Sequence, residues 1–339
     1  MGSSDPTVWP IGFVRQVPVV IGREGTASRF DHTDYVSSTL EFRCNLKCVH
    51  CMIEDTMDRL VPQSPDQLKA LLAHNAAHRK WTGLILTGSE ITLHRDLPEW
   101  ARMARRSGFQ HVRIQTHGMR LAQAGYCEEL IEAGVDEFFV SVTAADAETH
   151  DAITQVPGSF DKTLRGLELL DACDHVSTIT NTVVTALNFT QLPRLVERLD
   201  VLKRLAQMEF WFYLPMSELD DKGLIASHLD ALPFLKSAIA ALRAAGRGIE
   251  VKNFPECLLG ADRDVLYNDQ PALFIDPAFW TEFDRNGFHQ CVHRERCAST
   301  QCLGLNSAYR AKYGDHAESL APLPDAQNRT APDAESGVR

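Results

Sequence analysis

The sequence predicts an α/β fold in which a parallel sheet curls toward a barrel, followed by an irregular, cysteine-bearing extension. Short apolar segments alternate with amphipathic helical segments six times between residues 35 and 246. Strands that alternate with helices form parallel sheets, because each helix crosses over the sheet to reach the next strand. From residue 257 onward this periodicity gives way to a loop-like segment with four cysteines.

Each element is expected from its own local pattern. Strands are predicted at residues 35–42, 84–87, 111–116, 135–142, 176–185 and 208–214. Helices are predicted at residues 64–80, 94–107, 122–133, 146–152, 160–173, 190–206 and 224–246. Pro65 suits the first position of the first helix, because an N–H group there has no partner within the helix. Gly108 ends the second helix.

Composition and charge exclude several classes of protein. The chain has 339 residues, a net charge of −11 and a pI of about 5.6. This acidic balance argues against binding to nucleic acid or anionic membranes, which requires a surplus of Lys and Arg. The sequence contains no run of 18 apolar residues and no apolar signal segment at its start, so we expect a cytoplasmic protein. Seven of the nine cysteines lie in two clusters and two stand alone; in such a reducing compartment, clustered cysteines indicate metal sites rather than disulfides.

Four segments are expected along the chain. Residues 1–34, rich in Pro, Gly and polar residues, form an irregular arm before the barrel at residues 35–215. Residues 216–315 hold a helical linker and the late cysteines. Residues 316–339 consist largely of Ala, Pro, Asp and Ser without an apolar pattern, so we expect a disordered tail there.

The most informative motif is a group of three cysteines directly after the first predicted strand. Cys44, Cys48 and Cys51 have C-x3-C-x2-C spacing, and no further cysteine follows before Cys127. Thiolates are the usual ligands of iron–sulfur clusters, and a cubane has four irons to ligate. Three cysteines therefore leave one iron open to a ligand that is not protein. The alternative is one half of a zinc site whose remaining ligand lies elsewhere.

About 40 residues later, the second predicted strand ends in Thr87-Gly88-Ser89-Glu90. The two motifs together resemble the radical S-adenosylmethionine (radical SAM) superfamily. The resemblance implies a partial (β/α)6 TIM-like barrel and a [4Fe–4S] cluster whose open iron chelates SAM. It implies reductive cleavage of SAM to a 5′-deoxyadenosyl radical that abstracts a substrate hydrogen. It also implies an electron donor of the flavodoxin or ferredoxin type.

The resemblance also assigns SAM contacts. In the family the second strand ends in Gly-Gly-Glu-Pro, which binds the amino group of the SAM methionine. Gly88, Ser89 and Glu90 occupy the first three of these positions, and Ile91 stands where the family has Pro. His50 matches the position beside the adenine, and its alternative role is to donate to a cluster sulfur.

Three later strand ends supply the remaining contacts that the resemblance implies. His117 lies in Ile114-Gln115-Thr116-His117-Gly118, where the family often has Thr-Asn-Gly. Ser141 is the position that contacts the SAM carboxylate or ribose, although Thr143 and Ala144 replace the Asp-Gly of the family pattern. Asn181, in the fifth strand, is expected to reach the ribose. His150 and Asp151 are expected to cap and order their segment.

A second group of cysteines lies near the end of the chain. Cys257, Cys291, Cys297 and Cys302 are the full complement for one [4Fe–4S] cluster. Their spacing resembles the C-terminal auxiliary-cluster extensions called Twitch and SPASM. A cluster with four cysteine ligands has no open iron, so it would move electrons or support structure. A closed zinc site is the alternative.

The remaining candidates are fewer and more ordinary. Cys127 and Cys173 are expected to be buried and inert. Tyr213, Met216 and Glu218 follow the sixth strand, where α/β barrels build active sites. Phe210 and Phe212 are expected in the core.

The sequence therefore predicts a radical SAM enzyme in which an auxiliary cluster supports the oxidative modification of a small metabolite. The alternative within the family is a maturase of a ribosomally made peptide. Only about 34 residues precede the first strand, and leader-binding domains of such maturases are longer. A non-catalytic zinc or iron–sulfur metalloprotein is the alternative from another class.

Overall fold

A single parallel sheet organises the molecule. The computed structural model describes residues 32, 34–53 and 59–324. Its strands are β1 (Tyr35–Glu41), β2 (Gly83–Gly88), β3 (His111–Thr116), β4 (Glu137–Ser141), β5 (Ser177–Val184), β6 (Leu205–Phe212), β7 (Gly248–Lys252) and β8 (Ala272–Phe274). They follow the order β7-β6-β5-β4-β3-β2-β1-β8, and every neighbouring pair is parallel. Within the described residues β7 and β8 remain edges, so the barrel is partial and open, as predicted.

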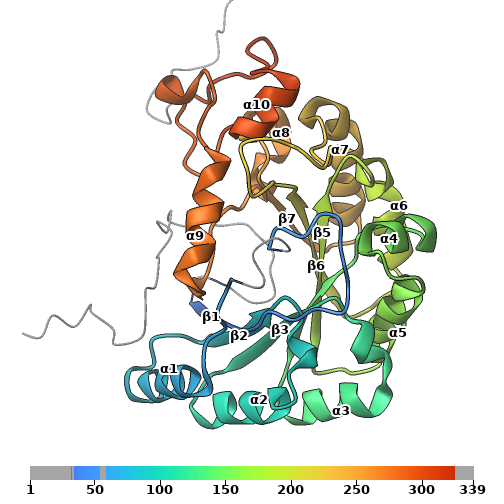
Figure 1. Cartoon of the computed structure of the whole chain (residues 1–339). Helices are drawn as coiled ribbons and strands as arrows, with labels where there is room; N and C mark the ends of the chain where they lie inside the picture. The colour runs from blue at the N-terminus through green and yellow to red at the C-terminus, as the bar shows by residue number, and fades with distance from the viewer. Residues whose placement is uncertain (1–31, 33, 54–58, 325–339) are drawn as a thin grey trace, which may run out of the picture.

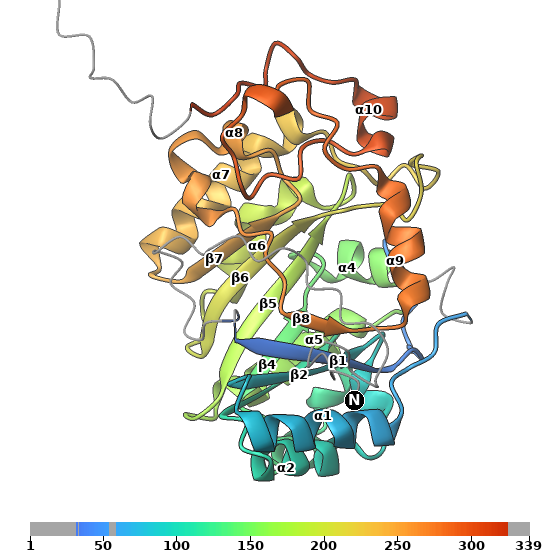
Figure 2. The same cartoon turned by 90° about the vertical axis from the view of Figure 1, so that its left-hand side faces the viewer.

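The helices cover the outside of the sheet (Figure 1). They are α1 (Pro65–His78), α2 (Leu97–Arg106), α3 (Ala124–Glu132), α4 (Ala147–Thr154), α5 (Ser159–Asp171), α6 (Leu192–Leu199), α7 (His228–Ala244), α8 (Glu256–Leu259), α9 (Pro277–Phe283) and α10 (Ser307–Tyr313). Short 3-10 helices are η2 (Ile91–Leu93), η3 (Met119–Ala122), η4 (Phe189–Gln191), η5 (Gly260–Val265), η6 (Asp284–Asn286) and η7 (Arg294–Arg296). Figure 2 shows α8 and α10 together at one end of the molecule, beside α7. No helix among the described residues is long and apolar enough to cross a membrane.

Local chemistry explains where the first helix starts and stops. Ser64 accepts a hydrogen bond from Gln67 N, and the Gln67 side chain accepts one from Ser64 N, which completes a capping box before Pro65. At the other end Asn75 is fully buried. Its side chain both donates to Trp81 O and accepts from Trp81 N, at 3.0 and 2.9 Å. These bonds fix the turn that leads from α1 into β2.

The two faces of the sheet differ in polarity because side chains alternate along each strand. One face packs under the helices and is apolar, with Val36, Leu84, Val112, Phe138, Val140, Met208 and Val251 in the main core. The opposite face lines the inside of the barrel and carries polar side chains, among them Thr87, Gln115, Glu137, Ser141, Asn181, Glu209 and Glu250. A polar interior is suited to binding a polar ligand rather than to packing.

Three sequence-based boundaries were wrong. The barrel does not end at residue 215, because β7 and β8 come from the expected linker and extend the sheet at both edges. The helix expected at 190–206 ends at Leu199, since Leu205 and Ala206 already belong to β6. Residues 316–324 are part of the described structure, with Leu320 buried. The rest of the expected tail, and the N-terminal arm apart from His32 and Asp34, lie outside the described residues.

Candidate active site

The first cysteine group lies in the loop that follows β1, and this loop is hydrogen-bonded to the end of α4. Lys47 N and Val49 N donate to the carbonyl oxygens of Thr154 and Ile153 at 3.0 and 2.9 Å. Leu46 N points to Cys44 Sγ at 3.4 Å. Cys44, Cys48 and Cys51 are all half-buried and free of disulfides. The loop is thus held by the barrel on both sides, and its thiols remain available as ligands.

Gly88 brings β2 against the strand that leads into this loop. It pairs with Glu41, and Ser89 N donates to Glu41 O at 2.7 Å. A Cβ atom at position 88 would stand 1.9 Å from Glu41 O and less than 3 Å from two further backbone atoms of Glu41. The expected close backbone approach at Gly88 is therefore an approach to the chain itself, three residues before Cys44.

Glu90 holds the ends of β2 and β3 together. It is fully buried, and its carboxylate accepts hydrogen bonds from the Thr92 and Thr116 hydroxyls and from His117 N, at 2.5, 2.7 and 2.8 Å. Burial opposes its ionisation, but attraction to His117 and these hydrogen bonds lower the pKa of Glu90 to about 2. The carboxylate therefore accepts hydrogen bonds from donors of the chain, and its contact with the SAM amino group stays a prediction.

His117 connects Glu90 to the cysteine loop. Its Nε2 atom lies 3.0 Å from Glu90 Oε2 and 2.7 Å from Asn45 Oδ1. Burial lowers the pKa of His117, but attraction to Glu90 and a hydrogen bond with Cys44 outweigh it and raise the pKa to about 9. Asn45 was missed by sequence reasoning, although its place inside the cysteine motif was a signal. These contacts link the second and third strand ends to the loop.

Several predicted SAM contacts have buried polar atoms without a hydrogen-bond partner among the described residues. They are His50 Nδ1, Ser89 Oγ and Asn181 Nδ2, and Thr143 Oγ1 shares this property. Ser141 is in register with Asn181 on the inner face. Buried polar groups without partners are costly and uncommon in native proteins. Their presence at these positions fits a polar ligand such as SAM.

The segment after Ser141 is ordered by local caps. Asp151 accepts from Gly158 N and Phe160 N at 2.6 and 2.9 Å, so it fixes the start of α5. His150 is buried and accepts from Thr143 N at 3.3 Å. Both residues therefore have the ordering role that the sequence predicted.

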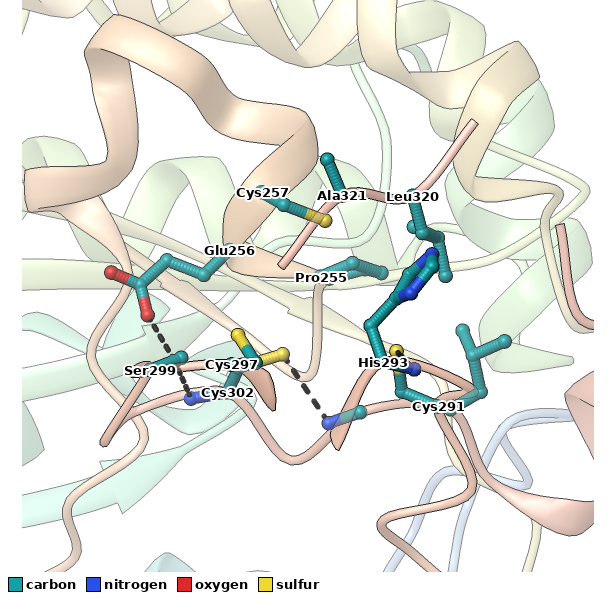
Figure 3. A pocket seen from close by; sticks show the side chains of 12 residues that line it. Pro255, Glu256, Cys257, Cys291, His293, Cys297, Ser299, Cys302, Leu320 and Ala321 are labelled. Carbon is teal, nitrogen blue, oxygen red and sulfur yellow. Dashed lines mark hydrogen bonds between the residues drawn. The ribbon is translucent and has the colours of Figure 1, made fainter. Parts of the chain in front are cut away.

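The four late cysteines surround one cavity (Figure 3). Each sulfur has a backbone N–H donor: Ala321 for Cys257, His293 for Cys291, Leu323 for Cys297 and Gly304 for Cys302. Ala321 and Leu323 belong to the segment that was expected to be disordered. Hydrogen bonds to sulfur stabilise the thiolate form and are one of the features that set the potential of a bound cluster.

The spacing of the ligand atoms bears on which metal the cysteines could hold. Among the described residues, His32, Glu209 and Glu250 form a group of ligand atoms that lie within 4.8 Å of one another, and neither cysteine group has three sulfurs so close. Two sulfurs on one zinc ion stand at most ~4.6 Å apart, because each Zn–S bond is about 2.3 Å. In a cubane every cysteine binds a different iron, which suits the wider spacing.

Comparisons with known proteins agree with these sites. The Radical SAM superfamily model matches residues 42–199. The chain is 34% identical over 186 residues to the AdoMet-dependent heme synthase of Methanosarcina barkeri, a match covering 54% of this chain and 51% of that protein. Residues 42–199 of the chain therefore form a radical SAM domain. The chain is also 31% identical over 175 residues to the GTP 3′,8-cyclase of Chlorobaculum tepidum, covering 50% of this chain and 51% of the cyclase.

Solved structures show the same radical SAM fold. Native anSMEcpe with bound AdoMet aligns with a TM-score of 0.52 at 17% identity, over 64% of this chain and 63% of that one. Streptococcus suis SuiB bound to its precursor peptide SuiA aligns with a TM-score of 0.51 at 15% identity, over 65% of this chain and 48% of SuiB. The chain spans about half the length of the curated relatives it matches. Membership of the superfamily implies a [4Fe–4S] cluster and SAM.

The other candidate residues differ in how deeply they are buried. Cys127 is buried in α3, and burial raises the pKa of its thiol to about 11, as expected of an inert cysteine. Cys173 packs against the core. Phe210 and Phe212 are core residues, as predicted. Tyr213 is buried in a small apolar cluster with Leu305 and Tyr309, Met216 packs near Phe279, and Glu218 is exposed.

Proposed function

We propose that this chain cleaves SAM reductively and uses the resulting 5′-deoxyadenosyl radical to abstract hydrogen from a small metabolite. The observation that carries the proposal is the juxtaposition of two features. A loop with three half-buried cysteines that form no disulfide follows β1, and the neighbouring strands carry buried polar atoms that have no hydrogen-bond partner in the described chain.

In this proposal Cys44, Cys48 and Cys51 hold the catalytic cluster. When bound, the cluster supplies an open iron for SAM and the electron that cleaves it. Ser89 and Ser141, at the ends of β2 and β4, and Asn181, within β5, contact SAM, and His50 lies beside the adenine.

The contacts of Glu90 and His117 support a role in positioning the cysteine loop rather than a role in contacting SAM. Glu90 holds His117, and His117 holds the Asn45 side chain in the cysteine loop. Because both groups are buried, the pair fixes the loop relative to the ends of β2 and β3. Gly88 contributes in the same way, by allowing β2 to approach Glu41.

Cys257, Cys291, Cys297 and Cys302 hold an auxiliary [4Fe–4S] cluster in this proposal. Three observations support it: the shared cavity, one N–H donor for each sulfur, and sulfur spacing too wide for a single zinc ion. With four cysteine ligands no iron is left open for substrate. Such a cluster suits an oxidative outcome, in which the substrate gives up an electron as well as a hydrogen atom.

Several features favour a small metabolite over a peptide as substrate. Relatives with 34% and 31% identity are named for heme synthesis and for cyclisation of GTP. SuiB, whose structure contains a precursor peptide, shares only the fold at 15% identity. The carboxylates on the inner face of the barrel also suit a polar substrate. A flavodoxin or ferredoxin is proposed as the electron donor.

Anaerobic purification followed by metal and product analysis tests the proposal. We expect about eight irons per chain with little zinc, and release of 5′-deoxyadenosine from SAM after reduction with dithionite. Cys48→Ala should lose this release. Cys127→Ala, which changes a cysteine outside both groups, should keep it. Wild-type protein that holds iron but never releases 5′-deoxyadenosine would contradict the proposed function.

A further inference from the structure

We propose that Glu209 is the residue of the active site that exchanges a proton with the substrate. The negative charge of the neighbouring Glu250 favours the protonated form of Glu209. The inference rests on the proposed function, because it places the substrate inside the barrel next to SAM. It concerns residues that the cysteine and SAM motifs do not include.

Strand register places the two carboxylates in the layer of the proposed SAM contacts. Ser141 on β4 is in register with Asn181 on β5, Asn181 with Glu209 on β6, and Glu209 with Glu250 on β7. Neighbouring strands are about 4.8 Å apart, so Glu209 stands one strand from Asn181. The Asn181 Nδ2 atom is buried without a hydrogen-bond partner in the described chain. A ligand that satisfied this donor would lie beside Glu209.

Glu209 and Glu250 are held close together inside the barrel. They are 2% and 3% exposed, and Gln207 Nε2 donates to Oε1 of both at 2.9 Å. Trp211 Nε1 donates to the other oxygen of Glu209 at 2.8 Å. Trp211 is the next inward residue toward the carboxyl end of β6 and is half-buried. Two buried carboxylates that share one hydrogen-bond donor in this way repel each other when both are ionised.

When all are ionised, the buried side chains around Glu209 carry one more negative charge than positive charge. Three carboxylates, Glu137, Glu209 and Glu250, face two cations, Arg113 and Lys252. Arg113 binds Glu137 in a bidentate pair at 3.0 and 3.1 Å, and Lys252 lies 3.6 Å from Glu250. A single proton makes the group neutral, whereas a divalent ion would leave it with a net positive charge. The charge balance therefore favours a proton over a metal ion.

The neighbours of Glu209 increase its affinity for a proton. Burial and the charge of Glu250 raise the pKa of Glu209 above its ordinary value, while Lys252 and Arg113 oppose the rise. His32, which lies 3.9 Å from Glu250, stays neutral because burial lowers its pKa well below its usual 6.5. General acids and bases work best when their pKa lies near the working pH.

The proton transfer follows removal of a hydrogen atom from the substrate. Ionised Glu209 takes the proton of an O–H or N–H group on the carbon that has become a radical. That bond breaks, its electron pair stays on the substrate, and Glu209 becomes a neutral acid. No electron enters or leaves in this step. In the opposite direction neutral Glu209 returns the proton.

Infrared difference spectroscopy on the holoenzyme tests where the proton resides, without substrate. A neutral carboxylic acid has its own C=O stretch. We expect such a band to persist above pH 4.5, the ordinary pKa of a Glu carboxyl, and to be lost as the pH rises further. Glu209→Gln should lack the titrating band, and Glu132→Gln, at an exposed site in α3, should retain it. Trp211→Phe removes a hydrogen bond that favours ionisation, so it should move the midpoint to higher pH. A band that persists in Glu209→Gln overturns the inference.

A second measurement separates this inference from the proposed function. Reduced enzyme is incubated with SAM and a small-molecule extract of the source cells, and both 5′-deoxyadenosine and new products are followed by mass spectrometry. Glu209→Gln should form about a hundredfold less product per 5′-deoxyadenosine released than the wild type. Unchanged product formation overturns the role of Glu209. Wild-type enzyme that releases no 5′-deoxyadenosine overturns the proposed function, whatever the infrared band shows.

Discussion

Replacing Gly88 with alanine should damage the catalytic cysteine loop from a distance. The new Cβ atom would lie 1.9 Å from Glu41 O, 2.8 Å from Glu41 C and 2.9 Å from Glu41 N. All three are backbone atoms, which cannot move aside as the end of a side chain can. The strand pair must therefore separate at its carboxyl end, just before Cys44.

The cost of Gly88→Ala can be worked out from these contacts. Overpacking in a well-packed interior costs about 1–3 kcal/mol, and a contact with fixed backbone belongs at the upper end of that range. Separation of the strands also breaks the hydrogen bond from Ser89 N to Glu41 O, which adds about 1 kcal/mol. We expect a loss of about 4 kcal/mol in the free energy of unfolding. Displacement of the loop should also lower iron uptake at the first cysteine group.

Urea unfolding of the metal-free protein and iron analysis after reconstitution measure the two effects. Gly125→Ala is the matched control, because a Cβ atom there has no neighbour within 4 Å and the position is helical. It should be neutral or stabilise by up to about 1 kcal/mol. A Gly88→Ala protein within about 0.5 kcal/mol of the wild type and with full iron content would refute the reasoning.

Two further predictions concern buried polar groups. Glu90→Gln should destabilise by about 3 kcal/mol, because it leaves His117 without its buried counter-charge. Since the folded-state pKa of Glu90 is about 2 and its ordinary value is 4.5, that stability is complete above pH 4.5 and is lost as pH falls toward 2. Thermal melts from pH 7 to 3 should therefore converge for wild type and variant, and parallel curves would contradict this. Asn75→Ala leaves Trp81 N and O unpaired in a buried turn, which should cost about 2–3 kcal/mol in urea unfolding. A loss below about 0.5 kcal/mol would show that water replaces the amide.

Local sequence patterns were sufficient to predict the alternating strands and helices of the barrel. The capping box at Ser64 and the apolar face of each strand involve neighbours within a few residues, so the sequence displays them directly. The strand β8 has only three residues, Ala272–Phe274, and β7 was missed for a different physical reason. β7 carries Glu250 and Lys252 on its inner face, and a strand with inward charges lacks the apolar signature of a buried strand.

The features of the candidate sites also divide into those that a local sequence pattern predicts and those that depend on the tertiary structure. The spacing of Cys44, Cys48 and Cys51 is local, and so is the run from Thr87 to Glu90. The contact between His117 and Asn45 spans 72 positions, and the bridge from Gln207 to Glu250 spans 43. No local pattern encodes such pairs, because they depend on which strands become neighbours.

The sequence by itself determined that the chain holds two groups of cysteines on an α/β scaffold, since ligand spacing and periodicity are properties of short segments. The tertiary structure decided what surrounds them. It placed the Glu90 carboxylate against His117. It brought backbone donors from residues 321 and 323 to the late cysteines. It also aligned Glu209 and Glu250 with Ser141 and Asn181, because parallel strands bring distant residues into one layer.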